Sequence, residues 1–79
     1  MLILYFAQAR RLAGIASESL ALTKPVTAEA LWCEILARHP ALAPLQPVTR
    51  LARNGEFADA DVQFYPNDEV ALIPPVSGG

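Results

Sequence analysis

Cysteine, histidine and basic side chains are scarce in this chain of 79 residues, and each scarcity excludes a class of function. The single cysteine, Cys33, cannot form an internal disulfide, and together with the single histidine, His39, it is too little for a metal cluster. We therefore expect no metal site, and the low cysteine content fits a reducing cytoplasm. Six Lys and Arg residues against eight Asp and Glu residues give a net charge of −2, which predicts no binding of nucleic acid or of a membrane surface.

The chain also lacks a long hydrophobic run. No stretch approaches the roughly 18 continuous apolar residues of a membrane-spanning helix, and no basic segment stands between Met1 and the first apolar run, as it would in a signal peptide. Apolar residues are nevertheless abundant, at 53% of the sequence, which is ample for one small core. We expect one globular domain over residues 1–79, in the cytoplasm.

The first apolar run of the chain predicts a strand with two apolar faces. Alternation along a strand puts Ile3 and Tyr5 on one face. Leu2, Leu4 and Phe6 then fall on the other face. Only one of these sets can belong to an ordinary one-sided core, so the second set indicates a surface that a partner covers.

A helix and four further strands are predicted downstream. Thr27 is the expected N-cap of a helix that stops near His39, because Pro40 follows, and its apolar stripe should lie across a sheet: Ala28, Leu31, Trp32, Ile35 and Leu36. Turn signals and alternation predict strands over residues 17–22, 49–53 and 69–73 and a short strand over 62–64, with the chain beginning its return at 56–57. They also predict a helical turn over 8–12 and an irregular connection over 41–48 with room for one helical turn. This order predicts an α+β fold: a mixed sheet of four to five strands with one main helix packed across one face.

The last six residues carry the functional prediction, Pro74-Pro75-Val76-Ser77-Gly78-Gly79. Glycine has no Cβ, so a Gly-Gly end can enter a slot too narrow for a side chain. The Gly79 carboxylate is an anion at neutral pH, since an α-carboxyl has a pKa of roughly 3.3 to 3.7, and it therefore needs activation, most simply by ATP on a partner enzyme. Pro74 and Pro75 should end the preceding strand and send the chain outward in an extended form. The competing interpretation is a frayed terminus without function.

Three stretches of the chain resemble the ubiquitin-like β-grasp sulfur carriers, and most closely the family of molybdopterin synthase small subunits. They are Leu4-Tyr5-Phe6-Ala7 followed by Gly14, the turn Asn54-Gly55-Glu56, and Asp68-Glu69-Val70-Ala71-Leu72-Ile73-Pro74-Pro75-Val76-Ser77-Gly78-Gly79. The resemblance implies a β-grasp fold in which residues 74–79 form a flexible functional tail. One departure is Asn67, where the family usually has glycine.

The resemblance also implies a mechanism in two stages. An activating enzyme adenylates the Gly79 carboxylate with ATP, and sulfur replaces the adenylate to give a thiocarboxylate. The tail, with Gly78 before the reactive group, then enters the large subunit of molybdopterin synthase in a heterotetramer and donates sulfur to cyclic pyranopterin monophosphate. The chain itself is expected to bind no cofactor and to be no enzyme alone. The expected partner-binding residues are Phe6, Phe57, Ile73, Pro74, Pro75, Val76 and Ser77.

Three alternatives stay open at this stage: a sulfur carrier of another pathway, such as the thiamine type, a ubiquitin-like protein modifier, and an interaction module with an inert tail. Elsewhere in the chain, Cys33 and His39 are expected to be structural. The acidic loop residues are expected to be solvated, with at most a role in steering a basic partner: Asp59, Asp61, Asp68 and Glu69.

Overall fold

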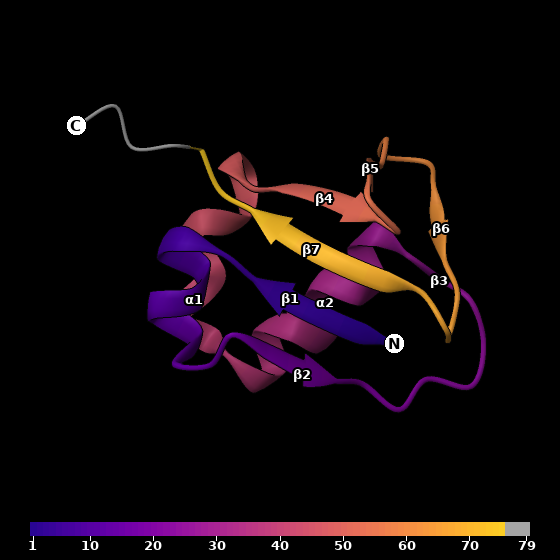
Figure 1. Ribbon diagram of the computed structural model, residues 1–79, viewed down its shortest axis with the longest axis horizontal. Coiled ribbons are helices and arrows are strands. Elements are labelled where there is room, and N and C mark those ends of the chain that lie inside the picture. The colour runs from indigo at the N-terminus through magenta and orange to yellow at the C-terminus, as the bar shows by residue number, and fades with distance from the viewer. Residues whose placement is uncertain (76–79) are drawn as a thin grey trace.

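The computed structural model describes residues 1–75, which form two sheets. The strands are β1 (Leu2–Tyr5), β2 (Ser17–Ser19), β3 (Val26–Thr27), β4 (Arg50–Arg53), β5 (Glu56–Phe57), β6 (Gln63–Phe64) and β7 (Glu69–Ile73). The main sheet has the order β2-β1-β7-β4-β5, in which β1 and β7 are parallel and the other neighbours are antiparallel. The predicted mixed sheet is confirmed, and the last strand, β7, lies at its centre (Figure 1).

Helix α2 (Ala28–Arg38) packs across one face of this sheet, as predicted (Figure 1). The Thr27 Oγ1 accepts a hydrogen bond from the Ala30 N–H at 3.1 Å, so the predicted N-cap is confirmed. Leu31 and Ile35 of its apolar stripe are fully buried. They pack with the inward residues of the sheet: Ile3, Tyr5, Leu51, Val70 and Leu72. Full burial of one such side chain contributes about 1.5–3 kcal/mol, so this layer stabilises the fold.

Two further helical segments connect the strands. Helix α1 (Ala7–Ala13) ends at Gly14, which adopts a φ of 79° that favours glycine. The segment η1 (Pro40–Val48) is a continuous 3₁₀ helix, so the expected irregular connection with one helical turn was wrong in its extent. Proline fits this geometry because its fixed φ lies within the 3₁₀ range, and the fully buried Leu42 anchors the segment to the core. No helix within residues 1–75 is long and apolar enough to cross a membrane.

The small second sheet was not predicted. Strands β3 and β6 pair in antiparallel fashion, with Val26 opposite Phe64 and Thr27 opposite Gln63. The strand at β6 was expected, but Val26 and Thr27 looked like an interruption before the helix, because two residues have no readable periodicity. Their pairing is fixed by Phe64, which is fully buried in the core beside α2.

The predicted turn at Asn54-Gly55 is confirmed, and it is tied to the start of β7. Both residues have positive φ, at 52° and 89°, as expected for the tight turn of a hairpin. The Asn54 amide donates to Asp68 Oδ1 at 3.0 Å, and its oxygen accepts from the Glu69 N–H at 2.9 Å. Asp68 Oδ2 also accepts from the Tyr65 N–H at 2.8 Å. The expectation that Asp68 is merely solvated was therefore wrong.

This network also changes the acidity of Asp68. Partial burial favours the neutral acid, but the hydrogen bonds from the Tyr65 N–H and the Asn54 amide outweigh it and lower the pKa of Asp68. The carboxylate is thus a clamp between the β4–β5 turn and the β6–β7 turn.

Candidate functional site

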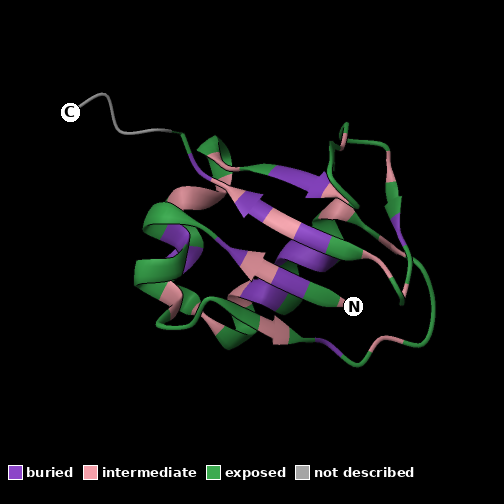
Figure 2. Ribbon diagram, in the orientation of Figure 1, coloured by how far each residue is buried: buried purple, intermediate pink, exposed green. Residues whose placement is uncertain are grey.

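The face of the main sheet opposite α2 is left uncovered by the described chain, and we call it the open sheet face. Figure 1 looks onto it, with α2 behind the strands. The registers place four residues in one row across four strands: Leu4, Ala71, Ala52 and Phe57. Along β7 the residues alternate between buried and more accessible positions (Figure 2), so Ala71 and Ile73 point to the open sheet face.

Small residues at the centre of the row make this face concave. Ala52 and Ala71 form the floor of a hollow of about 260 Å³. The larger apolar side chains stand around it: Leu4, Phe6, Phe57 and Ile73. Phe6 is 48% exposed and Phe57 is 54% exposed, which is unusual for phenylalanine in a chain with a well-packed core. The structure therefore brings the three predicted contact residues Phe6, Phe57 and Ile73 to one surface.

Phe6 reaches this face because the chain turns sharply after it. Ala7, the first residue of α1, has a φ of 50°, a left-handed conformation that an alanine adopts at an energetic cost. The Phe6 carbonyl accepts the N–H groups of Ala9 and Arg10 at 3.0 and 3.3 Å, which fixes the turn. A strained residue, Ala7, thus directly follows Phe6, and strained backbone is often found at functional surfaces.

The tail begins at the same end of the sheet. Ile73 is the last residue of β7, and Pro74, which follows it, is buried in the fold, whereas Pro75 is exposed. Pro74 therefore anchors the start of the tail to the domain. The predicted functional residues Val76, Ser77, Gly78 and Gly79 lie outside the described residues.

A polar cluster on the helix side of the sheet was missed by the sequence analysis. The Tyr5 hydroxyl donates to Glu18 Oε1 at 2.5 Å, and His39 Nε2 lies 2.6 Å from the same oxygen. The rings of Tyr5 and His39 meet edge to face with centroids 5.4 Å apart. Arg38 adds a longer ion pair to Glu18 Oε2 at 3.7 Å. The cluster connects β1, β2 and the end of α2, so His39 is structural as expected, but with a partner that the sequence did not identify.

Hydrogen bonding within this cluster shifts two acidities. Burial raises the pKa of Tyr5, and the acceptor carboxylate of Glu18 raises it further. For Glu18, burial favours the neutral acid, but the hydrogen bonds from Tyr5 and His39 prevail and lower its pKa. The hydroxyl is therefore held neutral and the carboxylate charged, which suits a fixed structural contact.

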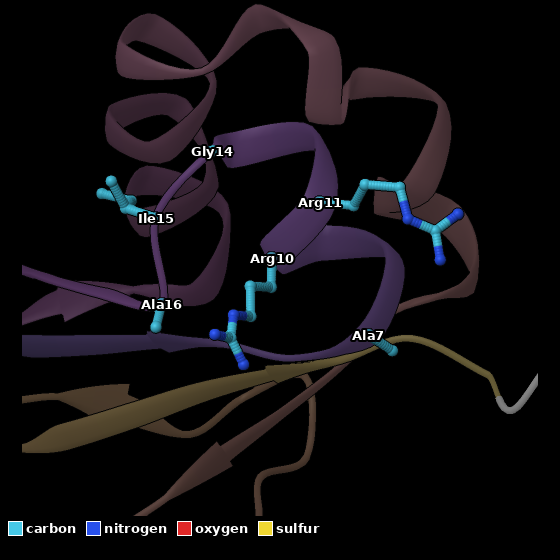
Figure 3. Close-up of a pocket in the computed structure, with 6 residues that line it drawn as sticks. All are labelled: Ala7, Arg10, Arg11, Gly14, Ile15 and Ala16. Atoms are coloured by element: carbon cyan, nitrogen blue, oxygen red, sulfur yellow. The ribbon is translucent and has the colours of Figure 1, made fainter.

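A second hollow, of about 540 Å³, lies beside α1 and has a different character. Its charged side chains are Arg10, which extends toward Ala16, and Arg11, which points away to the other side of the helix (Figure 3). Within residues 1–75, no three His, Cys, Asp or Glu side chains gather where they could hold a metal ion. Cys33 is exposed on α2. The open sheet face, continuous with the tail, is thus the candidate site.

A mixed sheet with one helix across it and a central last strand defines a ubiquitin-like β-grasp protein. The crystal structure of SAMP1 from Haloferax volcanii has this fold, with a TM-score of 0.85, 29% identity, and coverage of 100% of this chain and 98% of that chain. The chain matches the ThiS family over residues 3–79, and it belongs to that family.

Two curated relatives carry the same name, molybdopterin synthase sulfur carrier subunit. The protein from Homo sapiens is 38% identical over 80 residues, covering 98% of this chain and 91% of the relative. The protein from Chlamydomonas reinhardtii is 37% identical over 79 residues, covering 98% of this chain and 95% of the relative. The resemblance drawn from the sequence is therefore confirmed.

Proposed function

We propose that this chain is the sulfur carrier subunit of a molybdopterin synthase. The names of the curated relatives support this assignment, and so does family membership over almost the whole chain. The observation that carries it is the continuity of the open sheet face with the tail. Ile73 lies on that face and Pro74 is the next residue, so a partner that covers the face also receives the tail in a fixed direction.

The proposed chemistry takes place on the carboxylate of Gly79. A partner activating enzyme joins this carboxylate to the AMP part of ATP and releases pyrophosphate. A sulfur nucleophile then attacks the acyl carbon and AMP leaves, which gives a thiocarboxylate. In this proposal the chain itself contributes no acid or base to these steps and binds no cofactor. Its Gly78-Gly79 segment has no side chains and therefore fits a narrow active site.

In the second stage the thiocarboxylate enters the large subunit, and its sulfur forms a bond to a carbon of cyclic pyranopterin monophosphate. Water then cleaves the bond between this sulfur and the acyl carbon of Gly79, which restores the carboxylate. Residues Val76 to Gly78 act as the spacer between the anchored Pro74 and the reactive group. At about 3.1 Å per residue, five extended residues span roughly 15 Å, so a segment as long as residues 75–79 has the length to reach into a partner's pocket. Such an arm delivers the sulfur into a partner's pocket while the open sheet face stays docked. The complete enzyme is proposed to be a heterotetramer of two small and two large subunits.

The covalent step is tested by the intact mass of the chain after incubation with its activating enzyme, ATP and a sulfide source. We expect the mass change of one oxygen replaced by one sulfur, and no change for a chain that lacks Gly79. A chain extended by one residue after Gly79 should fold normally and stay unmodified. Sulfur transfer by the extended chain would contradict the proposal. Isopeptide adducts on lysine residues of other proteins, with no thiocarboxylate, would instead identify a protein modifier.

Docking is tested separately by binding of the large subunit to open-face variants. Phe57→Ser should weaken binding by about 30-fold or more, as loss of an aromatic anchor at the centre of an interface does. The matched control is Tyr65→Ser, which removes a similarly exposed aromatic side chain, 48% exposed, that does not line the hollow. Equal affinities of the two variants would rule out the open sheet face as the docking surface.

A further inference from the structure

Two charged side chains stand on the mostly apolar open sheet face, Glu69 at the start of β7 and Arg50 at the opposite end of the sheet. Arg50 is the cross-strand partner of Ile73, at the end of the sheet where the tail begins. Its guanidinium carbon lies 3.7 Å from the centre of the Phe57 ring, in a stacked cation–π contact. Arg50 therefore belongs to the same surface as Phe57 and Ile73, although it does not fit the apolar pattern by which that surface was predicted.

The two arginines of β4 differ in how they are used. Arg53 Nη1 donates a hydrogen bond to the Gln63 carbonyl at 2.7 Å, so this side chain links β4 to β6 within the fold. For Arg50, no carboxylate among residues 1–75 comes within ion-pair distance, and its guanidinium carbon lies over the Phe57 ring. The N–H donors at its edge remain available to a partner, in the forked geometry that matches a carboxylate.

Docking of a partner changes the surroundings of the Arg50 N–H donors. A protein that covers Phe57 also removes water from the guanidinium stacked on it. A charge that loses its water destabilises a complex unless an acceptor of opposite charge replaces the water. The stack fixes the position of the guanidinium, so that acceptor must lie at one place, beside the ring and near the start of the tail.

We propose that Arg50 is a specificity determinant of the open sheet face, and that the docking surface of the large subunit carries a carboxylate side chain that pairs with it. The inference rests on the proposed function for the identity of the partner. An apolar surface without this carboxylate would fit the hollow equally well in shape, but would leave Arg50 buried and unpaired. The charge thereby rejects wrong partners and sets the orientation of docking next to the tail.

The experiment measures the affinity of the full chain for the large subunit encoded in the same genome, at about 50 and about 300 mM NaCl. Arg50→Gln removes the charge and keeps a polar side chain of similar reach. Arg50→Lys keeps the charge but loses the planar fork. Lys24→Gln is the matched control, because it removes one positive charge from an exposed residue of the connection between β2 and β3, outside the strands of the main sheet. Thermal unfolding of each variant verifies that it is folded.

We expect Arg50→Gln to raise Kd by about 30-fold or more at low salt, as loss of one member of a buried charge pair does. The dependence of Kd on salt should also become weaker than in the unchanged chain. The Kd of Arg50→Lys should lie between those of Arg50→Gln and the unchanged chain. The Kd of Lys24→Gln should stay within about threefold of that of the unchanged chain.

Two results would overturn the inference while leaving the proposed function intact. One is an Arg50→Gln variant that binds as tightly as the Lys24→Gln control. The other is weaker binding with an unaltered salt dependence, which would make Arg50 only a support for Phe57. Failure of the unchanged chain to bind the large subunit would instead overturn the proposed function and this inference with it.

Discussion

Replacing Glu18 by alanine should destabilise the fold far more than the loss of an ordinary surface carboxylate. Its oxygen Oε1 is shared by the Tyr5 hydroxyl at 2.5 Å and by His39 Nε2 at 2.6 Å. Tyr5 is only 1% exposed, so its hydroxyl has no access to water that could replace the lost acceptor. The variant Glu18→Ala thus leaves a buried donor without a partner.

The magnitude follows from these contacts. A buried donor left unsatisfied costs about 1–3 kcal/mol, and a hydrogen bond to a charged acceptor is worth about 1.5–3 kcal/mol. The ion pair with Arg38 adds little, because it is 3.7 Å long and the Arg38 side chain is 46% exposed. We expect a total loss of about 2–3 kcal/mol, which in a domain of this size lowers Tm by roughly 10–20 °C.

The assay is unfolding by urea and by heat at pH 7, followed by circular dichroism. Glu34→Ala is the matched control, since Glu34 is an exposed glutamate on α2 without a hydrogen-bond partner among residues 1–75. A double-mutant cycle with Tyr5→Phe should give a coupling free energy of about 1 kcal/mol or more. The reasoning is refuted if Glu18→Ala and Glu34→Ala have equal stability, or if the cycle shows no coupling.

The same carboxylate predicts how stability depends on pH. The folded pKa of Glu18 lies below its ordinary value of 4.5, so its contribution is present above pH 4.5 and is lost as the pH falls through the folded pKa. Tyr5 has the opposite sign: its pKa is raised above the ordinary 10.0, so its contribution is present below pH 10 and is lost at higher pH. Glu18→Ala should flatten the acid side of the stability profile relative to the unchanged chain. An acid side of unaltered steepness would contradict the assignment.

Substitutions at four further positions test other parts of the fold. Ile35→Ala empties a fully buried site and should cost about 2–5 kcal/mol in urea unfolding, whereas a cost below about 1 kcal/mol would mean that the core collapses around it. Asn54→Ala removes both side-chain hydrogen bonds at a residue with a φ of 52° and should lower the free energy of unfolding by about 2 kcal/mol. Asn54→Gly loses the same hydrogen bonds but adopts this φ without strain, so it should cost less. A larger loss for Asn54→Gly than for Asn54→Ala would contradict this account of the clamp. Ala7→Gly should relieve the left-handed strain and raise Tm slightly, so a large decrease would show that the strain is absent. Cys33→Ser, at an exposed position, should leave Tm and binding unchanged, and a clear loss in either would reveal a role for the thiol.

Features with a local physical cause were readable from the sequence. The stripe of α2 and its N-cap Thr27 follow from helical spacing and from the unpaired N–H groups of a first turn. The turn at Asn54-Gly55 follows from two neighbouring residues that tolerate positive φ. The two apolar faces of β1 follow from alternation alone, and they indicated a surface for a partner before its position was known.

The sequence by itself therefore determined the main strands, helix α2 with its N-cap and the turn at Asn54-Gly55, because each depends on neighbours a few residues apart. Tertiary structure alone decided which elements meet. It placed β7 at the centre of the sheet, gave Tyr5 its acceptor thirteen residues away in Glu18, and brought Arg50 over Phe57. Such contacts are fixed by strand order and register, which depend on how the whole core packs. For this reason Phe6, Phe57 and Ile73 were predicted only through the resemblance to a family. Arg50, which lies beside them, was found only in the structure.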